Sequence, residues 1–259
     1  MRQPCDNSKQ PAATCRMPDP ATTDDTILGG RVRLRQPAKG YRVALDPVIL
    51  AAVLPDGFRG RILDLGCGVG AAALCAAVRL PHATVFGIER DAWLADLARQ
   101  NVAANALTER VEIVTADIRA YTADTAFDAV LANPPYLEAS RANAQPDARK
   151  AAATIEDDAA LQVWIDVALA HLTPDGVFIM IHRADRLEDV RAALRDRVRG
   201  VAAFSLWPRD GAAPKRVIIC ASPRGALPQL ADGLVLHEAD GRYTHAAERV
   251  LRHAKGLIA

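Results

Sequence analysis

The sequence predicts an α/β protein built on a doubly wound, mostly parallel sheet of seven strands. From residue 61 onward, short apolar runs typical of buried strands alternate with longer runs that have helical spacing. Such alternation favours parallel strands joined by covering helices. A glycine-rich turn at residues 64–70 lies where the first of these strands should end and a helix begin. Glycines there let the backbone turn tightly and approach a ligand closely.

The predicted elements follow one another closely along the main part of the chain. Strands are predicted at residues 62–65, 85–88, 111–114 and 127–132, and helices at 71–79 and 92–105. A further helix is expected around residues 161–169, where apolar residues recur at helical spacing, and a strand at 177–181. Two late strands, at 203–207 and 217–220, flank a short loop with proline and glycine. This pattern predicts an antiparallel hairpin that closes the sheet.

The N-terminal region is expected to form a tail and a small extension. Residues 1–24 contain four prolines and almost no aliphatic residues, which predicts a disordered tail. Gly29 and Gly30 lie between two strand-like segments and predict a β-hairpin, and Asp46-Pro47 before an apolar run predicts the start of a helix. We therefore divide the chain into the tail, a hairpin and helix at 25–60, a main domain at 61–222 and a C-terminal extension at 223–259 that packs on this domain.

Bulk composition limits the class of protein. A chain of 259 residues with 50% hydrophobic residues can bury a full core, while a net charge of +1 does not decide for or against a nucleic-acid partner. The five cysteines lack the paired spacing of a zinc site, so we expect reduced thiols and no metal. No apolar run reaches membrane-spanning length, and the N-terminus lacks the apolar core of a signal peptide. These features predict a cytoplasmic protein without a membrane partner.

Acidic and polar residues at four predicted strand ends indicate the cofactor. Strand ends on one edge of a parallel sheet converge on one crevice, so Asp64, Glu89, Asp117 and Asn133 should face one ligand. Asp64 suits the ammonium group of a methionine moiety and its surroundings, and Glu89 suits the ribose hydroxyls. Asp117, with the backbone of Ile118, suits an adenine. The arrangement favours S-adenosylmethionine, and the predicted cofactor-binding residues are Asp64, Gly66, Cys67, Gly68, Gly70, Glu89, Arg90, Asp117, Ile118 and Asn133.

The glycine turn by itself leaves a second cofactor open. Gly66, Gly68 and Ala71 also satisfy the spacing of a dinucleotide-binding turn, in which Glu89 would likewise bind a ribose diol. A nicotinamide-dependent oxidoreductase, or a nucleotide-binding module without catalysis, is therefore a competing interpretation.

The tetrapeptide after the fourth strand carries the predicted chemistry. It consists of Asn133, Pro134, Pro135 and Tyr136, and its prolines stop the strand. A planar amine is a poor nucleophile because its lone pair is delocalised. The Asn133 side-chain oxygen and the Pro134 carbonyl can accept its two hydrogens and favour a pyramidal nitrogen, while Tyr136 stacks on the planar group. This predicts methyl transfer to a planar nitrogen, although a Pro-rich turn with an Asn cap would look the same in isolation.

These motifs, in this order, resemble the class I methyltransferases of the small-domain type from about Leu28 to the C-terminus. The resemblance implies a Rossmann-like fold. Residues 36–50, including Gly40-Tyr41-Arg42 and Asp46-Pro47, look like the corresponding segment of the bacterial tRNA(Val) adenine N6-methyltransferases, which modify the adenine beside the anticodon. Trp207-Pro208-Arg209 and Gly241-Arg242-Tyr243-Thr244 are also similar to that family. The resemblance therefore implies N6 methylation of an adenine in tRNA.

Two related activities share the tetrapeptide and stay open. Guanine amino-methyltransferases of ribosomal RNA and glutamine-amide methyltransferases of release factors use similar Asn-Pro-Pro-Tyr turns. The release-factor enzymes carry a separate N-terminal helical bundle, and the stretch before Arg61 holds only a hairpin and one helix. This shortage of chain weakens that alternative.

A surface that binds RNA is indicated by the charge of the N-terminal hairpin. No acidic residue occurs between Thr26 and Leu45, and in a strand Arg31, Arg33 and Arg35 would project to one face. A solvated strand edge protected by charge would have the same pattern. Residues 137–155 form a connection that can close over a target nucleotide or be disordered. The candidate RNA contacts are Arg31, Arg33, Arg35, Lys39, Tyr41, Arg42, Arg209 and Lys215. The sequence leaves monomer and dimer open.

Overall fold

The computed structural model describes residues 20–257, apart from residues 41, 136–157, 226 and 230–231. Several features predicted from the sequence therefore lie outside the described residues: most of the N-terminal tail, Tyr41, Tyr136 and the connection at 137–155. In the part of the chain that is described, no helix is both long and apolar enough to cross a bilayer.

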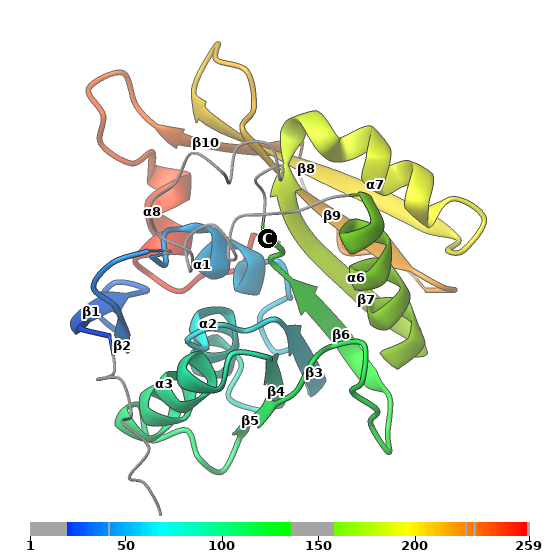
Figure 1. Ribbon diagram of the computed structural model, residues 1–259. Helices are drawn as coiled ribbons and strands as arrows, with labels where there is room; N and C mark the ends of the chain where they lie inside the picture. Colours follow the sequence, from blue (N-terminus) through cyan, green and yellow to red (C-terminus); the bar gives the residue numbers. More distant parts are fainter. Residues whose placement is uncertain (1–19, 41, 136–157, 226, 230–231, 258–259) are drawn as a thin grey trace, which may run out of the picture.

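Eight strands form the central sheet, in the order β10-β8-β9-β7-β6-β3-β4-β5 (Figure 1). The seven predicted strands are present as β3 (Gly60–Leu65), β4 (Ala83–Glu89), β5 (Val111–Thr115), β6 (Phe127–Ala132), β7 (Leu172–Arg183), β8 (Gly200–Arg209) and β9 (Arg216–Ser222). Strand β9 runs antiparallel to both of its neighbours, and the other pairs are parallel. The predicted mostly parallel sheet with an antiparallel last hairpin is confirmed.

The eighth strand was not predicted and comes from the C-terminal extension. Strand β10 (Gly233–His237) pairs in parallel with β8, with Leu234 opposite Leu206. Leu234 and Leu236 are buried in the same core as the central strands. The seven-strand expectation therefore undercounted the sheet, because a five-residue strand with two buried leucines gives a weak signal in sequence.

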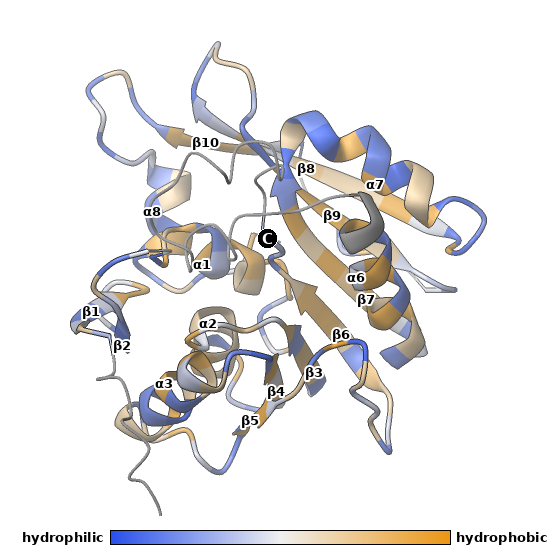
Figure 2. Cartoon of the chain, viewed as in Figure 1, coloured by the Kyte–Doolittle hydropathy of each residue, from blue (hydrophilic) through white to orange (hydrophobic). Residues whose placement is uncertain are grey.

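Helices cover both faces of the sheet, as a doubly wound fold requires. The helices α1 (Asp46–Ala52), α2 (Ala71–Arg79), α3 (Ala92–Ala104) and α8 (His245–Leu251) contribute to one hydrophobic cluster. The helices α6 (Asp158–His171) and α7 (Leu187–Leu194) contribute to a second cluster on the opposite face, and a short 3-10 turn, η1 (Ala184–Arg186), precedes α7 (Figure 1). Apolar residues dominate the central strands β6 and β7 between these layers (Figure 2).

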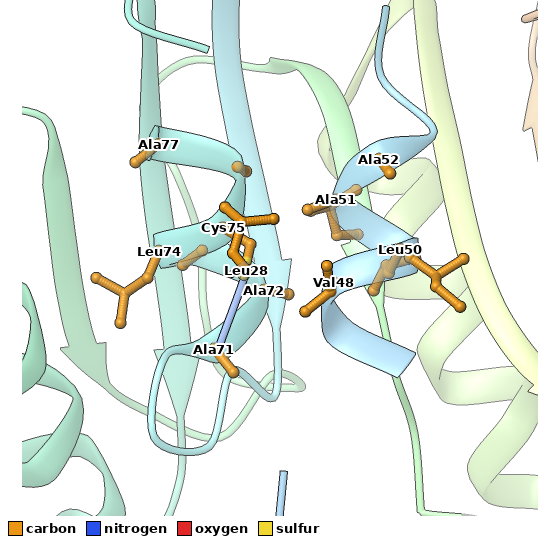
Figure 3. Close-up of a cluster of buried hydrophobic side chains, with 14 of the residues drawn as sticks. Leu28, Val48, Leu50, Ala51, Ala52, Ala71, Ala72, Leu74, Cys75 and Ala77 are labelled. Carbon is orange, nitrogen blue, oxygen red and sulfur yellow. The ribbon is translucent and has the colours of Figure 1, made fainter. Parts of the chain in front are cut away.

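Small side chains let α1 lie close to α2. Ala51 and Val48 of α1 face Ala72 and Cys75 of α2, and all four residues are buried (Figure 3). The low volume of alanine and cysteine permits close approach of the two helices at high packing density. This contact anchors the N-terminal helix beside the helix that follows the glycine turn.

The predicted hairpin is formed by β1 (Thr22–Ile27) and β2 (Val32–Pro37). Strand β1 begins at Thr22, so residues 22–24 belong to the hairpin and not to the predicted tail, because cross-strand pairing with β2 orders them. Leu28, Gly29 and Gly30 have positive φ angles at the tip. A Cβ atom at Gly29 would lie 2.1 Å from the carbonyl oxygen of Arg252, which shows how closely the tip packs against the end of α8.

Candidate active site

The carboxyl ends of four parallel strands meet on one rim of the sheet, as the sequence predicts. Leu65 pairs with Ile88 on one side and with Ala132 on the other, and Glu89 pairs with Thr115. The glycine turn, Glu89, Asp117 and Asn133 each follow or end one of these strands. A ligand placed at this rim is therefore within reach of all four.

The glycine turn uses three left-handed backbone conformations in five residues. Gly66, Gly68 and Gly70 have φ angles of 62°, 57° and 84°. A Cβ atom at Gly66 would lie 2.3 Å from Trp164 of α6, whereas a Cβ atom at Gly68 would meet nothing within 4 Å. Gly66 is thus needed for packing, and Gly68 borders open space in which a ligand can approach the backbone.

Glu89 ties the second strand end to the glycine turn. One carboxylate oxygen accepts a hydrogen bond of 2.9 Å from the Gly68 amide, and the other accepts one of 2.8 Å from the Asp91 amide. Asp91 in turn caps α3 by accepting from the amides of Trp93 and Leu94. Each oxygen of a carboxylate has a second lone pair, so Glu89 keeps acceptors for two hydroxyl groups of a ligand.

Asp64 is 2% exposed and accepts a hydrogen bond of 3.0 Å from the Ala73 amide in the first turn of α2. Burial raises the pKa of its carboxyl group to about 7, the negative charge of Glu89 adds to the rise, and the bond from Ala73 opposes it. This position gives Asp64 a structural role at the start of α2. Its contact with a cofactor stays a prediction.

The proline turn begins directly after β6. Asn133 is half-buried, Pro134 is buried and Pro135 is half-buried. Because Ala132 pairs with Leu65, the turn leaves the sheet beside the glycine turn. The glycine turn and the Asn-Pro-Pro turn therefore lie at the ends of two strands that are neighbours in the sheet.

A family model described as "Methyltransferase small domain" matches residues 45–204, which include both turns. The chain belongs to this methyltransferase family. Two relatives agree: the chain is 31% identical over 83% of its length to the tRNA1(Val) (adenine(37)-N6)-methyltransferase of Porphyromonas gingivalis, of which it covers 88%. It is also 28% identical, over 78% of its length, to the enzyme of the same name from Glaesserella parasuis, of which it covers 85%.

The fold of this methyltransferase also resembles solved structures. The crystal structure of a predicted O-methyltransferase from Agrobacterium tumefaciens is 25% identical to it, with a TM-score of 0.65, and the match covers 81% of this chain and 96% of the other. The resemblance to the tRNA(Val) methyltransferases and the Rossmann-like fold, both predicted from sequence, are confirmed. The methyl donor of such an enzyme is S-adenosylmethionine.

The remaining predicted cofactor residues of the methyltransferase lie on or beside the same rim. One oxygen of Asp117 accepts a hydrogen bond of 2.9 Å from the Arg119 amide, and Ile118 is half-buried next to it. Burial raises the pKa of the Cys67 thiol well above its ordinary value, so this residue serves as a small apolar group and not as a nucleophile. Arg90 is exposed.

Several of the predicted RNA contacts are used within the protein. Arg35 forms an ion pair with Asp24, and Arg42 forms one with Asp25, in both cases with N–O distances of 2.8 Å. Arg31 donates to the carbonyl oxygen of Arg252. Acidic residues just before Thr26 therefore neutralise part of the cationic hairpin: β1 brings Asp24 opposite Arg35 of β2, and Arg42, beyond the end of β2, reaches Asp25.

The other predicted cations have no ion-pair partner among the described residues. Arg33 and Lys39 are exposed on the hairpin side. Arg209 and Lys215 are exposed at the end of β8 and just before β9, on the same rim as Asn133. Arg216 beside them forms an ion pair with Asp46 at the start of α1, with an N–O distance of 3.1 Å, so the segment before the sheet also reaches this rim.

Sequence reasoning missed two residues that support the glycine turn. Trp164 packs at Gly66 from α6, and Asn101 of α3 donates a hydrogen bond of 3.0 Å to the carbonyl oxygen of Val69. Asn101 is 2% exposed. A polar residue on the apolar side of an amphipathic helix was the available signal, since buried polar groups need partners.

Proposed function

We propose that this methyltransferase transfers a methyl group from S-adenosylmethionine to the exocyclic N6 amine of an adenine in tRNA, the adenine beside the anticodon of tRNA(Val). The observation that carries the proposal is the Asn133-Pro134-Pro135 turn, which leaves β6 next to the glycine turn. The names of the relatives, which span most of the chain, support the same substrate.

The rim offers suitable partners for each part of the cofactor. The positive φ angles at Gly66, Gly68 and Gly70 and the open space at Gly68 allow the methionine part to approach the backbone. Glu89 would accept hydrogen bonds from the ribose hydroxyls with its remaining lone pairs. Asp117 would accept from the adenine amine while the Ile118 amide donates to the ring.

The proposed chemistry needs positioning more than acid–base catalysis. When bound, S-adenosylmethionine supplies a methyl group on a positively charged sulfur. The target nitrogen would take this methyl group, the sulfur would keep the electron pair of the carbon–sulfur bond, and the nitrogen would pass its extra proton to water. The Asn133 oxygen and the Pro134 carbonyl accept the two amine hydrogens and favour the pyramidal nitrogen. Tyr136 would stack on the base.

An adenine in an anticodon loop suits such a site. Bases in a loop are already partly unstacked, so turning one into the crevice costs less than extracting it from a duplex. Of the candidate RNA contacts, Arg209 and Lys215 are favoured, because they share the rim with Asn133 and have no ion-pair partner in the described chain. Arg35 and Arg42 are less favoured because each already has an acidic partner.

The proposal is tested by offering the purified protein labelled S-adenosylmethionine with unmodified tRNA(Val), ribosomal RNA or release factor in separate reactions. Mass spectrometry of the digested product identifies the methylated nucleoside or amino acid. We expect N6-methyladenosine in tRNA(Val), lost when the adenine beside the anticodon is replaced by guanine. Methyl groups found only on release-factor glutamine or on ribosomal guanine would reject the proposal in favour of one of the related activities.

A further inference from the structure

Two asparagines, Asn101 of α3 and Asn105 at the C-cap of α3, bind the free edge of β2 as a neighbouring strand would. The Arg35 amide donates to the Asn101 side-chain oxygen at 2.7 Å, and the Asn101 side-chain nitrogen donates to the Arg35 carbonyl at 2.9 Å. One helical turn later, the Arg33 amide donates to Asn105 at 2.9 Å, and Asn105 donates back at 2.7 Å. These four bonds satisfy the backbone amide and carbonyl groups of Arg33 and Arg35 on the free edge of the hairpin.

The match between helix and strand follows from their geometry. Four residues of an α-helix rise about 6 Å, and two residues of a strand advance about 6.6 Å, so side chains at positions i and i+4 reach alternate strand residues. An asparagine carries the same donor and acceptor as a peptide group, which lets each one pair with a residue of β2 as a strand would.

Asn101 differs from Asn105 in also reaching the glycine turn. Its side-chain nitrogen donates a second bond, of 3.0 Å, to the carbonyl oxygen of Val69. On the other side of the same peptide unit, the Gly70 amide donates to the Cys67 carbonyl at 2.8 Å. Hydrogen bonds therefore hold the peptide unit between Val69 and Gly70 from both sides. Without them, the glycines on either side of Val69 would let this unit rotate easily. The second donor bond of Asn105 stays within its own helix, on the carbonyl of Asn101.

We propose that Asn101 is a positioning residue that sets the cofactor-binding conformation of the glycine turn and couples it to docking of the N-terminal hairpin. Its one side chain is bonded to both segments at once, and its burial leaves no water to replace a lost bond. A hairpin that is docked on α3 therefore favours the turn that accepts the cofactor. By linkage, a bound cofactor favours the docked hairpin to the same extent.

This inference rests on the proposed cofactor site, in which the glycine turn holds the methionine half and Glu89 and Asp117 hold the adenosine half. The test is Asn101→Asp, which keeps the size and the acceptor but removes both donor bonds. S-Adenosylhomocysteine contains both halves, and 5′-methylthioadenosine contains only the adenosine half. In calorimetry we expect the dissociation constant of S-adenosylhomocysteine to rise about tenfold in this variant, and that of 5′-methylthioadenosine to stay within about twofold of the wild-type value.

The matched control is Asn105→Asp, which breaks a bond to the same hairpin edge without touching the glycine turn. It should leave the dissociation constants of both ligands within about twofold of the wild-type values. Equal binding of S-adenosylhomocysteine by Asn101→Asp and wild type would overturn the inference, as would an equal loss for both ligands. If the wild-type protein binds neither ligand, both this inference and the proposed function are rejected.

A second measurement uses the unaltered protein and does not depend on a variant that folds. Amide hydrogen exchange is compared with and without saturating S-adenosylhomocysteine. The Arg35 amide, which donates to Asn101, should exchange about fivefold more slowly with ligand because docking and binding are linked. The Arg195 amide, which donates to Ala192 at the end of α7 on the opposite face, should not change. Unchanged exchange at Arg35 would contradict the coupling.

Discussion

The Gly68 amide donates a hydrogen bond of 2.9 Å to the Glu89 carboxylate, so the first and second strand ends of the rim hold each other in place. The same carboxylate accepts from the amide of Asp91, the N-cap residue of α3. One acidic side chain thus fixes two backbone segments, and each of its oxygens keeps a second lone pair that can accept another hydrogen bond. Glu89 therefore has a structural role beside its proposed contact with the cofactor.

Replacing Glu89 by glutamine should weaken cofactor binding more than it weakens the fold. The amide keeps one oxygen acceptor, but its nitrogen cannot accept from Gly68, from Asp91 or from a ribose hydroxyl. A lost bond of a charged acceptor is worth about 1.5–3 kcal/mol, so the dissociation constant of S-adenosylhomocysteine should rise about tenfold or more. Calorimetry measures this, with the exposed Glu112→Gln as the matched control. Equal affinities for the two variants would contradict the assignment.

Alanine at Gly66 and at Gly68 should have different effects. At Gly66 the added Cβ would lie 2.3 Å from Trp164. A left-handed backbone at a residue other than glycine costs about 1–2 kcal/mol, and because of the clash we expect the unfolding free energy to fall by well more than that. At Gly68 the strain is similar but the space is open. Gly68→Ala should therefore fold and lose cofactor affinity. Urea unfolding and calorimetry on both variants check this. The reverse order of stabilities would contradict the packing role of Gly66, and an unchanged cofactor affinity in Gly68→Ala would show that the open space is not the binding space.

The buried carboxyl of Asp64 should make stability depend on pH. Its pKa is raised to about 7 in the folded protein from 3.8, mainly by burial. Between these pH values the folded state holds a proton that the unfolded state has released, so this stabilisation is complete below about pH 4 and is lost as the pH rises through 7. Asp64→Asn should remove that part of the pH dependence in urea unfolding from pH 5 to pH 8. Parallel curves for the variant and the wild type would refute the raised pKa.

Removing the Asn133 side chain should slow the chemical step and spare cofactor binding. Asn133→Ala deletes one of the two acceptors proposed for the amine hydrogens, which should raise the barrier by about 2–4 kcal/mol and lower kcat roughly thirtyfold to a thousandfold. The affinity for S-adenosylhomocysteine should stay close to that of the wild type. Single-turnover methylation of tRNA with each protein tests this, with the exposed Gln162→Ala as control. A full wild-type rate in Asn133→Ala would reject the role.

The two cationic surfaces should contribute unequally to tRNA binding. A double variant Arg209→Ala, Lys215→Ala removes exposed cations on the rim, whereas Arg35→Ala, Arg42→Ala removes cations that already have acidic partners. We expect the first pair to weaken tRNA binding and to lower the salt slope of affinity by about two. The second pair should change that slope less. Filter binding across a series of salt concentrations distinguishes the two double variants. A larger effect of the Arg35 and Arg42 substitutions would indicate that the hairpin is the main RNA-binding surface.

Local patterns were sufficient for most of the fold. The strands and helices around the glycine turn and the proline turn were placed from apolar periodicity and turn chemistry, because these depend on residues that are near in sequence. Strand β10 was missed, since it is short and its place depends on the edge that β8 offers. The start of β1 at Thr22 was missed for a similar reason: its order comes from pairing with β2.

The sequence by itself placed a glycine turn and an Asn-Pro-Pro turn at the ends of two parallel strands, and the carboxyl ends of such strands share one edge of the sheet. Tertiary structure alone decided the partners of each side chain. It buried Asp64 against Ala73, neutralised Arg35 with Asp24, and brought Asn101 between Arg35 and Val69. The physical reason is that strands, helices and turns follow from local periodicity and turn chemistry, whereas the order of strands and the burial and pairing of a polar group depend on residues far away in the chain that only packing brings near.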